Sequence, residues 1–422
     1  MNNHIASGIR IHTELPAEYR ELLSSGALDF IADLQRRFGA AYQQLAAEYA
    51  DREAAFKQQR SIDFPSETAD IRASEWTIGP SPILGPLQDR RVELVTATDR
   101  TALNAALTSE ASLATARMET DGATDLQHVL TAHLNVREAL AGVIGRETLT
   151  NAAELGDDAG VPLAFEPRPW TLREESVHVD GEPVHAALFD VGLFFFTNQG
   201  RFVGENKGCF LHLPRLHGHR EALLWNELFV QAQDAHSLPR GKIKVTVPIE
   251  TVTAAFEMHE ILYALREHAA ALSYGHQAYL AHLRALSGVT AERQSDTDSA
   301  PCLRALAQLL VKTCHRRGAY AIGGLTETAS AGEETLARIR EEKAQEAGDG
   351  FDGSRVAHVD LVPLLHEVFD HHLGGARVLH EERADIVPGA HDVFADSRQG
   401  PNQLGVMRED FEARAEDLLA LS

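Results

Sequence analysis

The chain has 422 residues, of which 44% are hydrophobic, and carries a formal net charge of −23. A chain of this length and composition can bury a sizeable core, which allows one large barrel with additions or two ordinary domains. The acidic excess excludes nucleic acids and anionic membrane surfaces as expected partners, because both are polyanions that such a surface repels.

The cellular location is inferred from the N-terminus and the cysteines. The first residues hold no basic segment followed by an apolar run, and no later run has the length needed to cross a bilayer. Cys209, Cys302 and Cys314 lie far apart without CxxC spacing, which fits a reducing compartment and argues against a disulfide framework or a zinc knuckle. We therefore expect a cytoplasmic globular protein with no membrane partner.

The chain opens on helices. From residue 17 to residue 49 apolar side chains recur at helical spacing, and a charged stretch follows to residue 60. This pattern predicts that residues 1–86 form an N-terminal helical cap.

From about residue 87 short apolar runs alternate with helical segments, typical of a parallel sheet covered on both faces. The predicted strands are 92–95, 162–165, 187–196, 242–249 and 319–322, and the predicted helices between them include 221–234 and 253–268. There are enough units to close a (β/α)₈ TIM barrel, the fold class we predict for residues 87–390. Residues 391–422 are expected to form a helical tail.

Two segments interrupt this alternation. The sequence VHVDGEP at 177–183 predicts a small inserted β hairpin that turns at Asp180 and Gly181. The polar stretch 291–299 predicts a loop. Neither segment has the size of an independent domain.

Several collinear segments resemble the short (A-type) malate synthases over nearly the whole chain. The main one begins LHLPRLHGHREALLWNELF at Leu211 and runs to Tyr279. The others are FPSETADIRASEWTI (64–78), LQDRRVEL (87–94), LFDVGLFFFTN (188–198), LLVKTCHRRGAYAIGG (309–324), VAHVDLVPLLHEVFD (356–370) and NQLGVMRE (402–409). The resemblance implies a barrel enzyme that condenses acetyl-CoA with glyoxylate. It also implies a magnesium ion that holds glyoxylate, an arginine that steadies the enolate oxygen, and an aspartate base from a C-terminal helical domain. Because the chain stops soon after NQLGVMRED, we expect that domain to be absent.

The resemblance places the metal site at positions that this chain keeps only in part. Glu250 matches the family's glutamate ligand, whereas Ala278 stands where the family has the aspartate ligand. Glu119 matches the glutamate of an Asp-Phe-Glu-Asp run whose flanking aspartates are here Arg117 and Thr120. Magnesium is usually held by one or two protein carboxylates, so losing one weakens the site severely. We therefore do not expect Mg²⁺ to bind in the family's mode.

The family's Arg-x-Arg-Gly segment aligns with Glu166, Pro167, Arg168 and Pro169, which puts Glu166 in the place of the enolate-steadying arginine. A carboxylate there repels an enolate, so the family's Claisen condensation is not expected. Since Arg117 and Glu166 each replace a residue of opposite charge, we predict that they form an ion pair. The alternative is that such a pair only preserves packing.

Three histidines fall in segments expected to border the barrel mouth, namely His217, His219 and His276. With Glu250 they form a candidate site for a transition metal, and imidazole also suits general acid–base work near neutral pH. The alternative for each is that it is a hydrogen-bonded histidine with a purely structural role.

These observations leave three hypotheses about function. The first is a diverged enzyme that makes or breaks a carbon–carbon bond in a small carboxylate, 2-oxo acid or acyl-CoA substrate, in a specialised pathway. Its catalytic candidates are Arg168, Glu166, Arg117, His276 and His217, and its substrate-binding candidates are Glu119, Glu250 and His219. The second is a catalytically inactive relative that binds a ligand or a protein, and the third is genuine malate synthase. A partner subunit that closes the pocket is a further expectation.

Overall fold

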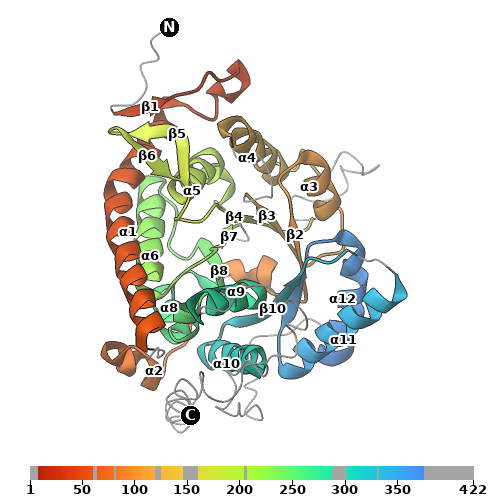
Figure 1. Cartoon of the computed structure of the whole chain (residues 1–422). Helices are drawn as coiled ribbons and strands as arrows, with labels where there is room; N and C mark the ends of the chain where they lie inside the picture. Colours follow the sequence, from red (N-terminus) through yellow and green to blue (C-terminus); the bar gives the residue numbers. More distant parts are fainter. Residues whose placement is uncertain are drawn as a thin grey trace.

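The computed structural model describes residues 8–59, 64–79, 82–118, 125–145, 160–203, 207–287, 301–329 and 332–374. Within them eight strands form a closed barrel in the order β10-β11-β2-β3-β4-β7-β8-β9 (Figure 1). These strands are β2 (Val92–Thr96), β3 (Leu113–Arg117), β4 (Leu163–Glu166), β7 (Cys209–His212), β8 (Ile243–Ile249), β9 (Ala269–Tyr274), β10 (Tyr320–Thr326) and β11 (Gly353–Val356). All neighbouring barrel strands are parallel, so the predicted (β/α)₈ barrel is confirmed.

Helices surround the barrel and bury the outer faces of its strands. They are α3 (Arg100–Leu107), α4 (Leu126–Leu140), α5 (Ala186–Asn198), α6 (His219–Ala235), α7 (Val252–Ala255), α8 (Met258–Ala264), α9 (His276–Ser287), α10 (Pro301–Arg317), α11 (Glu333–Asp349) and α12 (Val362–Leu373). Short 3-10 turns are η3 (Pro82–Leu87), η4 (Gln199–Arg201) and η5 (Val359–Leu361). Every residue of β8 is buried, as expected for a strand covered on both faces.

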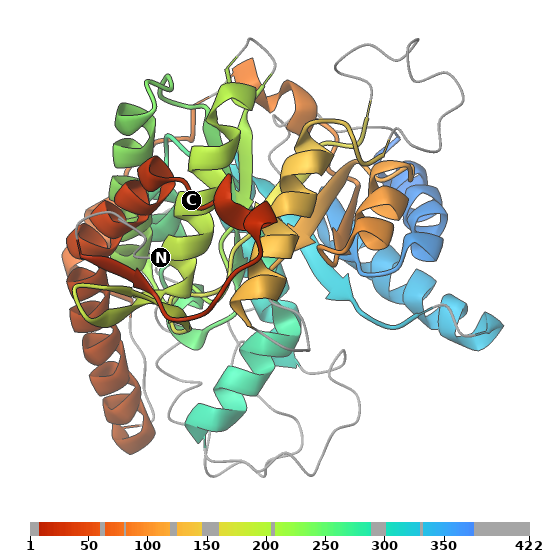
Figure 2. The same cartoon turned by 90° about the horizontal axis from the view of Figure 1, so that it is seen from above.

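The predicted N-terminal helices follow a short strand at Ile9–Ile11 and lie outside the barrel (Figure 1). After η1 (Ala17–Arg20), helix α1 (Ser25–Gln59) runs alongside α5 and α6, on the side of the barrel opposite α11 and α12 (Figure 2). Its buried stripe at helical spacing consists of Leu28, Ile31, Leu34, Phe38 and Tyr42. The turn η2 (Ser66–Thr68) leads into α2 (Ala69–Ala73), which packs on α8. No helix within the described ranges combines the length and apolarity needed to span a membrane.

The predicted hairpin is present as β5 (Arg173–Val179) and β6 (Glu182–His185). Asp180 and Gly181 both have positive φ, 53° and 97°, as the tight two-residue turns of hairpins require. The sequence pattern did not reveal that β1 (Ile9–Ile11) pairs with β5, which makes the hairpin a three-stranded antiparallel sheet. An ion pair of 2.7 Å between Arg36 Nε and Asp180 Oδ2 joins this sheet to α1.

Two predicted elements are wrong. Residues 187–196 form helix α5, not a strand, because a helix buried on all sides has no polar face and its apolar run reads like a buried strand. It lies between α1 and α4, and Phe194 stacks on Phe165 of β4 at 4.3 Å between ring centroids. The single helix predicted for 253–268 is two shorter helices, α7 and α8, interrupted at Phe256 and Glu257. The predicted loop 291–299 and tail 391–422 lie outside the described residues.

Candidate functional site

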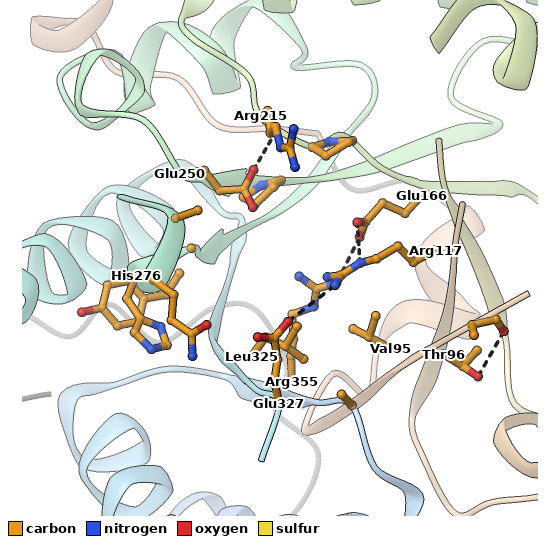
Figure 3. A pocket seen from close by; sticks show the side chains of 18 residues that line it. Val95, Thr96, Arg117, Glu166, Arg215, Glu250, His276, Leu325, Glu327 and Arg355 are labelled. Atoms are coloured by element: carbon orange, nitrogen blue, oxygen red, sulfur yellow. Dashed lines mark hydrogen bonds and ion pairs between the residues drawn. The ribbon is translucent and has the colours of Figure 1, made fainter. Parts of the chain in front are cut away.

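A cavity of about 470 Å³ opens at the carboxyl ends of the barrel strands (Figure 3). This is the end of a (β/α)₈ barrel at which active sites are built. The lining residues are Val95, Thr96, Ala97, Arg117, Glu166, Pro214, Arg215, Pro248, Glu250, Tyr274, Gly275, His276, Gln277, Ala278, Leu325, Glu327, Arg355 and Ala357. Four of the predicted site residues, Arg117, Glu166, Glu250 and His276, are thus brought together.

The predicted ion pair between Arg117 and Glu166 is confirmed. The two residues end the neighbouring strands β3 and β4 and are partners in the strand register, so both side chains reach the same wall of the cavity. Arg117 Nε donates to Glu166 Oε1 at 2.8 Å. Glu166 is almost fully buried and Arg117 partly exposed, with side-chain exposures of 7% and 28%.

This pair belongs to a larger charged network that sequence reasoning missed. Glu166 Oε2 lies 3.4 Å from an Nη of Arg355 and 3.2 Å from His212 Nδ1. Arg355 Nε in turn lies 3.9 Å from Glu93 Oε2, and Arg90 Nε donates to Glu93 at 2.6 Å. For Glu93 the available signal was a charged residue inside the apolar run VELVT, whereas the segment GSRV around Arg355 has no such apolar run.

His212 is held neutral within this network. Burial, reinforced by the positive charges of Arg355, Arg117 and Arg90, lowers its pKa well below the ordinary value. His212 therefore adds no charge of its own to the arginines and glutamates around it.

Glu250 lies across the cavity from Arg117, just after β8 (Figure 3). Its Oε2 accepts a hydrogen bond of 2.6 Å from the backbone N–H of Arg215, a residue with a φ of 55°. Burial in the barrel mouth, reinforced by the charge of Glu166, raises the pKa of Glu250 to about 7 despite the opposing Arg215 N–H. Such a carboxyl group can release and take up a proton near neutral pH.

His276 is the first residue of α9 and is almost fully buried against the cavity. Its ring stacks on Tyr274 with 5.0 Å between centroids. The backbone of β10 closes in behind it, because a Cβ at Gly324 would lie 2.4 Å from His276 Nδ1. His276 is therefore fixed at the same side of the cavity as Glu250.

The described residues do not fit the magnesium site that the resemblance implies. Glu250 supplies one carboxylate, already engaged by the Arg215 N–H, and Ala278 supplies none. Glu119 lies outside the described residues. Nowhere in the described ranges do three His, Cys, Asp or Glu side chains group so that they could hold a metal ion, and this includes the proposed His/Glu transition-metal set.

Arg168 is placed away from the cavity. Its guanidinium group forms ion pairs with Asp190 at 2.7 Å and with Glu174 at 2.9 Å. Its backbone N–H also donates a hydrogen bond to Asp190. Burial would raise the pKa of Asp190, but Arg168 and His133 outweigh it and lower the pKa to about 2. The guanidinium group thus joins β4 to α5 and does not face a substrate.

His217 and His219 also lie outside the cavity, contrary to the expected place at the barrel mouth. His217 stacks on Tyr49 of α1, with 5.3 Å between centroids, and lies 3.6 Å from Glu221. His219 Nδ1 is 2.7 Å from Glu257, which also pairs with Arg52 of α1. His217 thus contacts α1 directly, whereas His219 is linked to α1 through Glu257 and Arg52.

The His219–Glu257 pair predicts a pH-dependent stability. Burial would lower the pKa of His219, but the hydrogen bond and charge of Glu257 outweigh it and raise the pKa. A raised pKa stabilises the fold fully below the unfolded value of about 6.5, and this stabilisation is lost as the pH rises through the folded value. In urea unfolding, His219→Gln is therefore expected to lose more stability at about pH 6 than at about pH 9.

His185→Gln serves as the contrasting variant, because burial lowers the pKa of His185 to about 4. Its loss of stability should be no larger at the lower pH than at the higher one. Equal losses for His219→Gln at both pH values would contradict the assignment of a charged His219.

With this geometry established, comparisons with known proteins identify the family. A family model described as malate synthase, TIM barrel domain, matches residues 163–394. The malate synthase of Streptomyces clavuligerus is 40% identical over 371 residues, which cover 84% of this chain and 68% of the relative. The malate synthase of Myxococcus xanthus is 36% identical over 377 residues, covering 87% and 69%. Malate synthase A of Escherichia coli is 33% identical over 383 residues, covering 85% and 69%. The chain therefore belongs to the malate synthase family.

Proposed function

We propose that this protein is a diverged enzyme of its family that acts on a small carboxylate, 2-oxo acid or acyl-CoA substrate and makes or breaks a carbon–carbon bond. The observation that carries this proposal is the Arg117–Glu166 pair on the wall of the cavity. At both positions a charged residue is replaced by one of the opposite charge, so neither charge is simply lost. The cavity itself is kept. A site that had only decayed would have no need of a substrate-facing guanidinium group.

The ordinary family reaction is disfavoured at two points. Glu166 stands where a donor to the enolate oxygen is needed, and removing one such donor costs about 2.7–4 kcal/mol of transition-state stabilisation. Ala278 removes a metal ligand from the opposite wall. The proposed reaction therefore uses other groups to stabilise negative charge.

The proposed roles follow from the positions of the side chains. Arg117, with Arg355 behind Glu166, binds the negative end of the substrate. Glu250 and His276, on the facing side, exchange protons with the reacting carbon or oxygen. Arg168, His217 and His219 are left with structural roles, because their partners lie elsewhere.

The experiment is an NMR assay in D₂O with acetyl-CoA, glyoxylate, pyruvate, oxaloacetate and malate, singly and in pairs, with and without Mg²⁺. Exchange of hydrogen next to a carbonyl, or formation of a new carbon skeleton, supports an enzyme, and Glu250→Gln should abolish it. Malate formed from acetyl-CoA and glyoxylate only with Mg²⁺ would instead identify ordinary malate synthase and refute the proposal.

A second candidate is a catalytically inactive relative that binds a ligand or a protein. It is favoured by the combination of Ala278 and Glu166 at two positions of the family's chemistry. Tight binding of one of these compounds without exchange or turnover would favour it.

A further inference from the structure

Three arginines lie close together inside the barrel mouth. Arg90 and Arg355 are buried, with side-chain exposures of 1% and 6%, and Arg117 is 28% exposed. They face two buried carboxylates, Glu93 and Glu166, while His212 between them is neutral. Glu327 lies at the rim with a side-chain exposure of 56%, where water screens its charge. Among the described residues, two buried carboxylates thus serve three arginines, and Glu250 of the facing wall adds a further acid whose charge acts on Arg355.

Two of these arginines face the cavity. Both oxygens of Glu166 are engaged, Oε1 by Arg117 Nε and Oε2 by Arg355. Arg117 Nη1 is 3.8 Å from Glu327 Oε1, which is longer than a hydrogen bond. Arg117 and Arg355 both line the cavity, where Figure 3 shows Arg117 reaching toward its centre. A guanidinium group with its Nε engaged still presents Nη donors to a second carboxylate.

The described residues of the opposite wall do not supply a cation site. Its carboxylate, Glu250, already accepts the Arg215 N–H and feels the positive charge of Arg355, and Ala278 brings no ligand. In the family, a metal ion supplies positive charge at this cavity. Here the guanidinium groups of Arg117 and Arg355, on the β3–β4–β11 side, supply it.

We propose that this cavity binds a short-chain carboxylate of the 2-oxo acid class on Arg117 and Arg355 without a divalent cation. The proposal rests on the proposed function, because it specifies how that enzyme would hold its substrate. A cavity of about 470 Å³ takes such an acid with space to spare, and that space suits a second reactant.

Calorimetric titration tests this with three probes, glyoxylate, pyruvate and oxaloacetate, each added to the full chain in EDTA and in Mg²⁺. At least one probe should bind, with a Kd that is the same in both buffers. Binding that requires Mg²⁺, or no binding of any probe, overturns the proposal.

Matched variants assign the binding to the arginines. Glu166→Gln frees guanidinium donors of Arg117 and Arg355 and should tighten the binding of the probe. The double variant Arg117→Gln/Glu166→Gln keeps the charge balance of the pair and should weaken binding by about 10- to 100-fold, as expected for lost hydrogen bonds to a charged group. Arg100→Gln, which breaks an exposed pair with Glu138, should leave the Kd unchanged. A double variant that binds as tightly as the single Glu166→Gln variant would refute the role of Arg117.

The two proposals fail in different ways. Metal-independent binding without exchange or turnover would refute the proposed enzyme and leave the arginine site standing. Binding of the 2-oxo acid that requires Mg²⁺, together with turnover that yields a product other than malate, would refute the arginine site and leave the proposed enzyme.

Discussion

Replacement of Arg168 by methionine is expected to lower the free energy of unfolding by about 3–5 kcal/mol, as found when one partner of a buried ion pair is removed. The guanidinium group is 3% exposed and bonds to both Asp190 and Glu174, whose side chains are also buried. Methionine keeps much of the volume but leaves both carboxylates without their cation. Because the low pKa of Asp190 depends on Arg168 and His133, the variant must bury an unpaired charge or take up a proton.

Urea unfolding followed by circular dichroism measures this loss. The matched control is Arg100→Met, which breaks a pair with Glu138 that is exposed on both sides and should cost no more than about 1 kcal/mol. A loss for Arg168→Met as small as that of the control would show that the buried triad adds nothing to stability. Such a result would reopen a catalytic role for Arg168.

The substitution Ala278→Asp is expected to create magnesium-dependent stability, which we do not expect of the natural chain. The new carboxylate would share the cavity with Glu250, giving Mg²⁺ two carboxylate ligands where one is present now. Without the ion, two neighbouring carboxylates repel each other and should lower the melting temperature. At a concentration of about 100 times its Kd, Mg²⁺ should stabilise the variant by about 2.7 kcal/mol.

Thermal unfolding of the natural chain, Ala278→Asp and Ala278→Asn with and without Mg²⁺ measures this effect. The asparagine variant has the same shape without the charge and controls for the added volume. A rise in melting temperature of the natural chain on adding Mg²⁺ with glyoxylate would contradict our interpretation of the metal site. It would also favour ordinary malate synthase activity.

Much of the fold follows from patterns along the chain. Apolar runs that alternate with helical segments predict a closed parallel barrel, and the Asp180–Gly181 dipeptide predicts the hairpin turn. The opposite charges of Arg117 and Glu166, with the resemblance that puts them at one pocket, predict their ion pair. These features depend on local spacing or on a single pair of residues, which is why they are legible in the sequence.

Other features depend on what each segment meets in three dimensions. Helix α5 is buried on all sides, so its sequence is an apolar run without a polar face. The spacing of apolar residues therefore cannot tell a helix from a strand here. Glu93, Arg355 and His212 come from three strands far apart in the chain, and only the assembled barrel brings Arg355 and His212 to Glu166 and Glu93 to Arg355. The same closure directs Arg168 and His219 outward to α5 and α1. Composition and spacing thus set which elements form, whereas the side of the barrel that each side chain faces sets its partners, its charge state and its role.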